Sequence, residues 1–328
     1  MTGALQSRGF LRCVDRWVWS TGCPPCEAVE LGELRMFPTP IIERFVDLGG
    51  VRLNVATAGS GRPVVLLHGF PDSWRLWRDQ IRVLAAAGYR VIAPDLRGFG
   101  RSSRPPDVAD YRMSVLVGDI TGLLDSTGVD RAAVVGHDWG AVLAYQLAGG
   151  RPERVDRLVV VSVGYPAAAA VSGDPDRIQR SGYLRWFLPP GVAERLLPRD
   201  DWRLFRDWGW HGVERNTDPD CERQIADLSR PGALTAGLNW YRANLGSAAA
   251  ADQPVRALVP VLCPTMGVWS SGDQFMAEAQ MTRSSDFVTG PWRYERLGCD
   301  HWVPVHAAEE LGNLLLDFLG GPENPGCG

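Results

Sequence analysis

The sequence predicts an α/β protein with a mainly parallel, eight-stranded sheet, helices on both faces and one helical insertion. Three observations support this. Short apolar runs alternate with segments of helical period from residue 44 to residue 163. Residues 164–250 are rich in Trp, Arg and Pro and contain helical stretches without a strand signal. Strand character returns after residue 260. Such alternation is typical of parallel strands joined by helical crossovers.

The predicted elements follow from the apolar spacing. The first two strands meet at Gly49-Gly50, which predicts a hairpin. In the first predicted helix, Trp74, Trp77, Ile81 and Leu84 lie on one stripe. The predicted strands are Arg44–Leu48, Val51–Ala56, Val64–Leu67, Arg90–Ala93, Ala132–Val135, Leu158–Val163, Val261–Trp269 and Trp292–Leu297. The predicted helices outside the insertion are Asp72–Ala87, Met113–Leu124, Ala141–Leu147 and Ala308–Leu319.

The composition divides the chain into five parts. Residues 1–35 lack a clear period and carry three of the seven cysteines. We expect them to be an N-terminal extension, either upstream of a true start at Met36 or disordered. Residues 36–163 and 251–320 form the two halves of the α/β core, and residues 164–250 form a helical cap between them. Residues 321–328 are a tail.

Composition and charge exclude several classes of function. The net charge is −4, and the 34 basic and 38 acidic residues are dispersed, so neither nucleic acid nor a membrane surface is an expected partner. Every basic residue is Arg, which excludes lysine Schiff-base chemistry. Cys23 and Cys26 form a lone CxxC without a second pair, so we expect no metal or redox site. No apolar run reaches membrane-spanning length and no secretory h-region is present, so we expect a cytoplasmic protein.

The strongest motif is Val134–Ala141, V-V-G-H-D-W-G-A. A buried strand runs into Gly136-His137-Asp138-Trp139-Gly140 and a helix follows, which is the nucleophile elbow with Asp in place of Ser. Side chains at the two glycine positions would clash with the neighbouring strand and helix. The helix N-terminus favours negative charge and is expected to keep Asp138 ionised, and an ionised carboxylate is already a nucleophile. The simpler alternative is a chance GxDxG in which Asp138 only caps the helix.

The loop His68-Gly69-Phe70-Pro71 follows the third predicted strand. In folds with this elbow, one backbone N–H of that loop and the N–H of the residue after the nucleophile form an oxyanion hole. The predicted donors are therefore Phe70 and Trp139, whose side chains are also expected to contact substrate. We expect His68 to be a hydrogen-bonded structural residue. Asp95 and Arg97 lie in a turn-rich loop and are expected to tie loops together.

An acid and a base follow later strands. Asp273 lies just past the seventh predicted strand and His301 just past the eighth, where open α/β sheets place their sites. The order nucleophile, acid, histidine is that of α/β hydrolases. Asp300 is the rival acid, although adjacent residues of an extended loop point apart. His306 is the rival base, expected at the surface. His137 and His211 receive no role.

These motifs resemble those of the epoxide hydrolases of the α/β-hydrolase superfamily, over roughly Phe37 to Leu319. The matching segments are HGFPD at 68–72, DLRGFGRS at 95–102, GHDWGA at 136–141 and the Asp273/His301 pair. Haloalkane and fluoroacetate dehalogenases share them. The resemblance implies two cap tyrosines whose hydroxyls hold the epoxide oxygen. Tyr183 lies in a segment similar to the first tyrosine motif and Tyr241 in one similar to the second, the alternative for each being ordinary cap packing.

The resemblance implies that Asp138 opens an epoxide to form an ester, which water activated by His301 then hydrolyses to a vicinal diol. It implies no cofactor or metal, and no partner besides the epoxide and water; a homodimer is left open. Trp139 argues against fluoroacetate dehalogenases, which carry Arg there, and Phe70 against haloalkane dehalogenases, many of which carry Asn. A dehalogenase and a non-catalytic binding protein of the same fold stay as alternatives. Thr265–Arg296 departs from the commonest family pattern, which leaves the acid position and substrate size open.

The cap is also rich in aromatic residues. Their number suggests an apolar pocket for an aliphatic or aryl epoxide, although we expect most of them to form the core of the cap instead. These residues are Trp186, Phe187, Trp202, Phe205, Trp208, Trp210 and Trp240.

Overall fold

The structure is a computed structural model that describes residues 39–210, 218–246 and 259–320. The predictions for the extension 1–35, the tail 321–328 and His211 lie outside the described residues.

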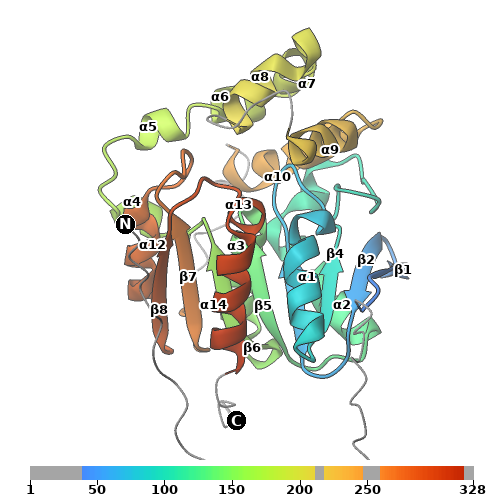
Figure 1. The fold of residues 1–328 in the computed structure, drawn as a ribbon. Coiled ribbons are helices and arrows are strands. Elements are labelled where there is room, and N and C mark those ends of the chain that lie inside the picture. Colours follow the sequence, from blue (N-terminus) through green and yellow to red (C-terminus); the bar gives the residue numbers. More distant parts are fainter. Residues whose placement is uncertain (1–38, 211–217, 247–258, 321–328) are drawn as a thin grey trace, which may run out of the picture. The chain divides into compact units, whose positions relative to one another are not determined.

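An eight-stranded sheet forms the centre of the fold, as predicted (Figure 1). The strand order is β1-β2-β4-β3-β5-β6-β7-β8. Strand β2 pairs antiparallel with β1 and with β4, and all the other neighbouring strands pair parallel. The strands are β1 Ile42–Asp47, β2 Arg52–Ala58, β3 Pro63–Leu67, β4 Arg90–Pro94, β5 Ala132–His137, β6 Val155–Val161, β7 Thr265–Ser270 and β8 Trp292–Leu297. All six residues of β5 are buried, as expected for a strand covered on both faces.

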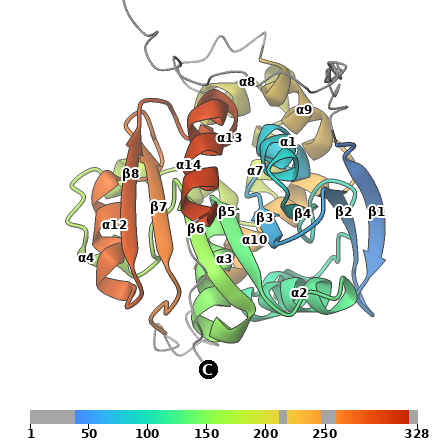
Figure 2. The same cartoon turned by 60° about the horizontal axis from the view of Figure 1, so that its bottom comes forward.

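Helices cover both faces of this sheet. Helices α1 (Arg78–Ala86) and α14 (Ala308–Gly320) lie together on one face, and α2 (Met113–Ser126) and α3 (Trp139–Gly150) lie on the other (Figure 2). The shorter elements of the core are η1 Trp74–Trp77, η2 Val108–Tyr111, η3 Pro152–Arg154, α12 Glu278–Thr282, η4 Arg283–Phe287 and α13 Val303–His306.

Two predicted elements start well before the observed ones, whereas the others begin and end within three residues of their predicted bounds. The strand expected over Val261–Trp269 begins only at Thr265, because Pro264 has no N–H for the ladder and Val261 makes an isolated bridge to Val288. The helix expected over Asp72–Ala87 begins as the 3-10 turn η1 and becomes α-helical at Arg78. Asp72 lies outside that helix: its N–H closes a turn onto the Gly69 carbonyl at 2.9 Å, and its side chain binds an arginine far along the chain.

The described helices between β6 and β7, which we call the cap helices, follow the predicted insertion. Helix α10 lies against the loops that leave the carboxyl ends of three strands, because Tyr241 contacts Phe70 and Trp139, and the Trp240 indole donates to the Arg97 carbonyl at 2.9 Å. The cap helices are α4 Ala168–Val171, α5 Arg177–Arg180, α6 Leu184–Phe187, α7 Val192–Leu196, α8 Arg199–Gly209, α9 Pro219–Leu228 and α10 Ala233–Leu245.

A buried ion pair attaches α9 to the core. Both nitrogens of the Arg223 fork bind the Asp72 carboxylate, at 2.8 and 3.1 Å, and Gln224 donates to the same carboxylate at 2.8 Å. The Asp72 side chain is 1% exposed. Burial raises the pKa of Asp72, but Arg223 outweighs burial and lowers it below its ordinary value. Because Asp72 follows Phe70 by two residues, this pair joins the cap to the predicted oxyanion loop.

Most of the cap aromatic residues form core, as expected. Phe187, Trp202, Phe205, Trp210 and Trp240 are buried. Trp186 and Trp208 remain to line a cavity that is described below. No helix within the described ranges is long and apolar enough to cross a bilayer.

We predict that Asp72→Asn lowers the free energy of unfolding by about 3 kcal/mol, because breaking a buried pair leaves an uncompensated charge. Asp220 still binds Arg223 at 2.8 Å, which keeps the loss at the lower end of the usual range. Denaturant unfolding at pH 7 measures it. The lowered pKa of Asp72 means that this stabilisation is present at neutral pH and is lost as the pH falls through that pKa.

The matched control is Asp79→Asn, which breaks an exposed pair with Arg82 and should cost less than about 1 kcal/mol. Equal losses in the two variants would show that the Asp72 pair contributes no more than a surface contact.

Candidate active site

The turn between β5 and α3 holds Asp138 at the end of a buried strand. Asp138 has φ 54° and ψ −123°, a strained conformation for a residue with a side chain. A Cβ at Gly136 would collide with the carbonyl oxygen of Gly140, and one at Gly140 with that of Leu67. These are the two collisions, with the helix and with the neighbouring strand, that the sequence predicted. The turn therefore presents the carboxylate above the sheet.

Two backbone amides hold that carboxylate. The Phe70 N–H donates to Asp138 Oδ1 at 2.8 Å, and the Trp139 N–H is a second hydrogen-bond donor. Burial raises the pKa of Asp138 above its ordinary value, and His301 and the two amides counteract that rise. The expected stabilisation of the ionised form at the helix N-terminus is thus present, but burial has the larger effect on the pKa.

His301 and Asp273 form a hydrogen-bonded pair beside the nucleophile. The distance from His301 Nδ1 to Asp273 Oδ2 is 2.9 Å, and from His301 Nε2 to Asp138 Oδ2 it is 3.9 Å. Because a carboxylate only accepts, Nδ1 carries the proton and Nε2 is left to act as a base. Burial lowers the pKa of His301, but Asp273 and Asp138 outweigh burial and raise it above the ordinary histidine value.

The structure places the rival acid and base away from this pair. Asp300 Oδ1 accepts from the Trp302 N–H at 2.9 Å and lies 2.8 Å from His306 Nδ1. His306 also lies 3.5 Å from Asp218. The carboxylate on His301 is therefore Asp273.

Two further histidines are buried around the site. His68 Nδ1 donates to the Gly69 carbonyl at 2.8 Å, and its Nε2 accepts from the Leu96 N–H at 2.9 Å, so it joins two loops as expected. His137 lies 2.9 Å from the carbonyl oxygen of His301, and its ring lies 4.8 Å from the His301 ring. Burial, assisted by His301, lowers the pKa of His137 to about 3, so it stays neutral.

Tyr183 and Tyr241 come together over the nucleophile. Their ring centroids are 6.0 Å apart, and the Tyr241 ring stands edge-on to Trp139 at 5.1 Å and to Phe70 at 5.5 Å. Burial and then the Asp138 charge raise the pKa of both phenols, so both keep their protons at neutral pH. The two cap tyrosines and the two predicted oxyanion residues thus surround one carboxylate.

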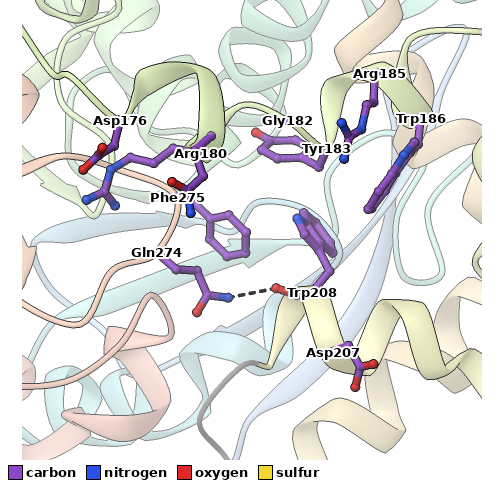
Figure 3. Close-up of a pocket in the computed structure, with 11 residues that line it drawn as sticks. Asp176, Arg180, Gly182, Tyr183, Arg185, Trp186, Asp207, Trp208, Gln274 and Phe275 are labelled. Carbon is purple, nitrogen blue, oxygen red and sulfur yellow. Dashed lines mark hydrogen bonds between the residues drawn. The ribbon is translucent and has the colours of Figure 1, made fainter.

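A cavity of about 440 Å³ opens beside Tyr183 (Figure 3). Tyr183, Trp186, Trp208 and Phe275 give it an aromatic side. The wall is more polar than the aromatic composition of the cap suggested, because six further side chains carry charge or an amide. They are Asp176, Gln179, Arg180, Arg185, Asp207 and Gln274.

Several residues that hold the site were not found from the sequence. Phe275 packs edge-on against the His301 ring at 4.9 Å, and Ser162 donates to the His301 carbonyl at 3.1 Å. Arg180 binds the backbone of Asp273. None belongs to a motif; the position of Phe275 two residues after the acid was the one available signal. Among the described residues, no group of three or more His, Cys, Asp or Glu side chains could hold a metal ion.

Comparison with known proteins agrees with this geometry. The α/β hydrolase fold family matches residues 62–305. Epoxide hydrolase A of Mycobacterium tuberculosis is 34% identical over 321 residues, covering 86% of this chain and 98% of that protein. The chain belongs to the α/β-hydrolase fold family, in its epoxide hydrolase branch.

Other members of this branch are also similar over most of their length. Epoxide hydrolase 1 of Siraitia grosvenorii is 46% identical over 311 residues, with 84% of this chain and 96% of that protein covered. The crystal structure of epoxide hydrolase A from Mycobacterium thermoresistibile superposes with a TM-score of 0.74 at 31% identity, covering 87% of this chain and all of that one. The α/β-hydrolase fold predicted from the elbow and the strand order is therefore confirmed.

We predict that His301 titrates above pH 6.5 and that Asp273→Asn lowers this pKa, because Asp273 is the largest cause that raises it. His301 is protonated below its raised pKa and becomes a base as the pH rises through it, so this variant should gain the neutral form at lower pH. NMR titration of the five histidines measures it, with His137 as an internal control that stays neutral down to about pH 3. An unchanged His301 titration would show that Asp273 does not set its charge.

Proposed function

We propose that this protein hydrolyses epoxides to vicinal diols through a covalent ester on Asp138, with His301, Asp273, Tyr183 and Tyr241 as its catalytic side chains. The observation that carries the proposal is the pair of protonated cap phenols beside a buried nucleophilic carboxylate. An alkoxide is a poor leaving group, and phenols can hydrogen-bond or protonate it as charge develops. The relatives named epoxide hydrolases support the same reaction.

In the first step, an Asp138 oxygen attacks one epoxide carbon from behind and inverts it. The bond from that carbon to the epoxide oxygen breaks. Tyr183 and Tyr241 stabilise this oxygen, one phenol gives it a proton, and the phenolate regains a proton from solvent. The product is a hydroxyalkyl ester on Asp138.

In the second step, His301 Nε2 takes a proton from water, and the resulting hydroxide attacks the carboxyl carbon of the ester. The Phe70 and Trp139 amides already bind an oxygen of this carboxyl group, so they are aligned to hold the oxyanion. Collapse breaks the bond between that carbon and the ester oxygen, and His301 returns the proton to the departing diol. Asp138 is left as a carboxylic acid, which releases its proton to solvent and regains its charge. Asp273 keeps the imidazole oriented and stabilises its charge.

Further features are proposed with this function. Residues 164–250 serve as a cap domain on the core of 36–163 and 251–320. Phe70 and Trp139 contact substrate together with the two tyrosines. Tyr183 lines the cavity of Figure 3, which gives the epoxide a route to Asp138.

We predict that the purified protein converts styrene oxide or a linear alkyl epoxide to its diol. Asp138→Asn should abolish turnover, and the Tyr183→Phe/Tyr241→Phe double variant should lower kcat at least about 10²-fold, because general acid catalysis of this kind contributes that much. Diol formation is measured by chromatography. Halide release from haloalkanes, undiminished by loss of both tyrosines, would support a dehalogenase instead, and tight epoxide binding without turnover would support a binding protein.

The ester itself is tested by one turnover of excess enzyme in H₂¹⁸O. The first diol should carry no label, because one of its oxygens comes from the epoxide and the other from Asp138, and the label should appear in the Asp138 carboxylate by peptide mass spectrometry. Label in the first diol would show direct attack by water and contradict the ester.

A further inference from the structure

The cavity beside Tyr183 lies between the cap helices and the loop that carries Asp273 (Figure 3). The cap supplies the segment around α5 and α6 on one side and the end of α8 on another. The core supplies Gln274 and Phe275, which follow Asp273 directly. The short loop after β7 is therefore in contact with two separate parts of the cap.

Two hydrogen bonds join this loop to the cap. Arg180, at the end of α5, donates from Nη1 to the backbone carbonyl of Asp273 at 2.9 Å, and its Nε lies 3.5 Å from the Asp174 carboxylate. Gln274 Nε2 donates to the backbone carbonyl of Trp208 in α8 at 2.9 Å, the bond drawn in Figure 3. Consecutive residues of one loop are thus fixed to two cap helices.

The other contacts of the loop lead to His301. The Asp273 carboxylate binds His301 through Oδ2 and accepts the N–H groups of Phe275 and Met276 through Oδ1, at 2.8 and 2.9 Å. The Phe275 ring lies 4.9 Å from the His301 ring and 5.2 Å from the Trp208 ring. A shift of this loop would therefore move both the acid and the aromatic surface that supports the base.

The position of the nucleophile depends less on this loop, which reaches the first step only through His301, 3.9 Å from Asp138, and through the contact of the Phe275 ring with Tyr183 at 6.0 Å. Asp138 is held by the amides of Phe70 and Trp139, which belong to the core. Its attack on an epoxide needs those amides and the cap tyrosines. Only the later hydrolysis needs His301 oriented by Asp273.

We propose that Arg180 and Gln274 are positioning residues that fix the Asp273–His301 pair relative to the cap. They affect the rate of ester hydrolysis rather than the rate of ester formation. This inference rests on the proposed function. It gives the cap a second role: besides carrying the tyrosines for the first step, the cap orients the base for the second.

The test resolves the two steps by rapid mixing of excess enzyme with styrene oxide. Trp139 lies beside the nucleophile and provides a fluorescence signal, and acid quenching followed by peptide mass spectrometry quantifies the Asp138 ester. The variants are Arg180→Met, Arg180→Lys and Gln274→Glu. Arg203→Gln is the matched control, because Arg203 is an exposed arginine of the cap helix α8 that does not line the cavity.

Arg180→Met and Gln274→Glu should slow ester hydrolysis about tenfold or more, because small displacements of a catalytic group have effects of this size. Ester formation should change less than about twofold, so the Asp138 ester accumulates. Arg180→Lys keeps a donor and should recover part of the hydrolysis rate. Arg203→Gln should leave both rates near those of the wild type.

Equal losses in both steps would overturn the proposal, because they would indicate a general loosening of the cap that also displaces Tyr183. Rates like those of Arg203→Gln in all three variants would overturn it as well. These outcomes differ from failure of the proposed function, in which the wild type itself forms no ester on Asp138; that result would remove both proposals together.

Discussion

In the proposed reaction Asp138 must carry a negative charge in a position from which water is largely excluded. Much of the surrounding structure stabilises that charge. Burial alone disfavours the ionised carboxylate. Two backbone amides and the imidazole of His301 counteract burial, and each comes from a different loop at the same edge of the sheet. The order of the parallel strands β3, β5, β7 and β8 brings these loops together.

The same requirement explains the strained backbone of the elbow turn at Asp138. A carboxylate that projects above a buried strand needs a backbone conformation that a residue with a side chain adopts only under strain. The strain persists because β5 is buried along its whole length and α3 begins at the next residue. Gly136 and Gly140 allow the strand and the helix to approach closely enough to fix it.

The cap supplies what the core lacks. In the proposed reaction the core supplies the nucleophile, the oxyanion hole and the base, a set that α/β hydrolases use for several reactions. The phenols of Tyr183 and Tyr241 add donors suited to an oxygen leaving group. Buried polar contacts keep this cap in place: Arg223 binds Asp72 near the oxyanion loop, and Arg180 binds the carbonyl of the acid. The cap is thus attached next to the oxyanion loop and next to the loop that carries the acid.

The sheet, the elbow and the candidate residues of the site could be predicted from the amino-acid sequence, because these depend on short-range patterns. Strand and helix periods are visible in single segments, and the glycines around Asp138 report a local steric need. The predicted bounds were wrong where a local pattern was interrupted, as at Pro264, or where a residue is held by contacts outside the predicted element, as at Asp72.

Three features depend on contacts between segments far apart in the chain and became visible only in the folded structure. They are which carboxylate faces His301, which aromatic residues line the cavity, and which contacts hold the acid loop. Asp273 and Asp300 both follow strands, and the choice depends on how two loops face each other across the sheet edge. The contacts of Arg180, Gln274 and Phe275 join segments far apart in the chain, so no spacing in the sequence reports them.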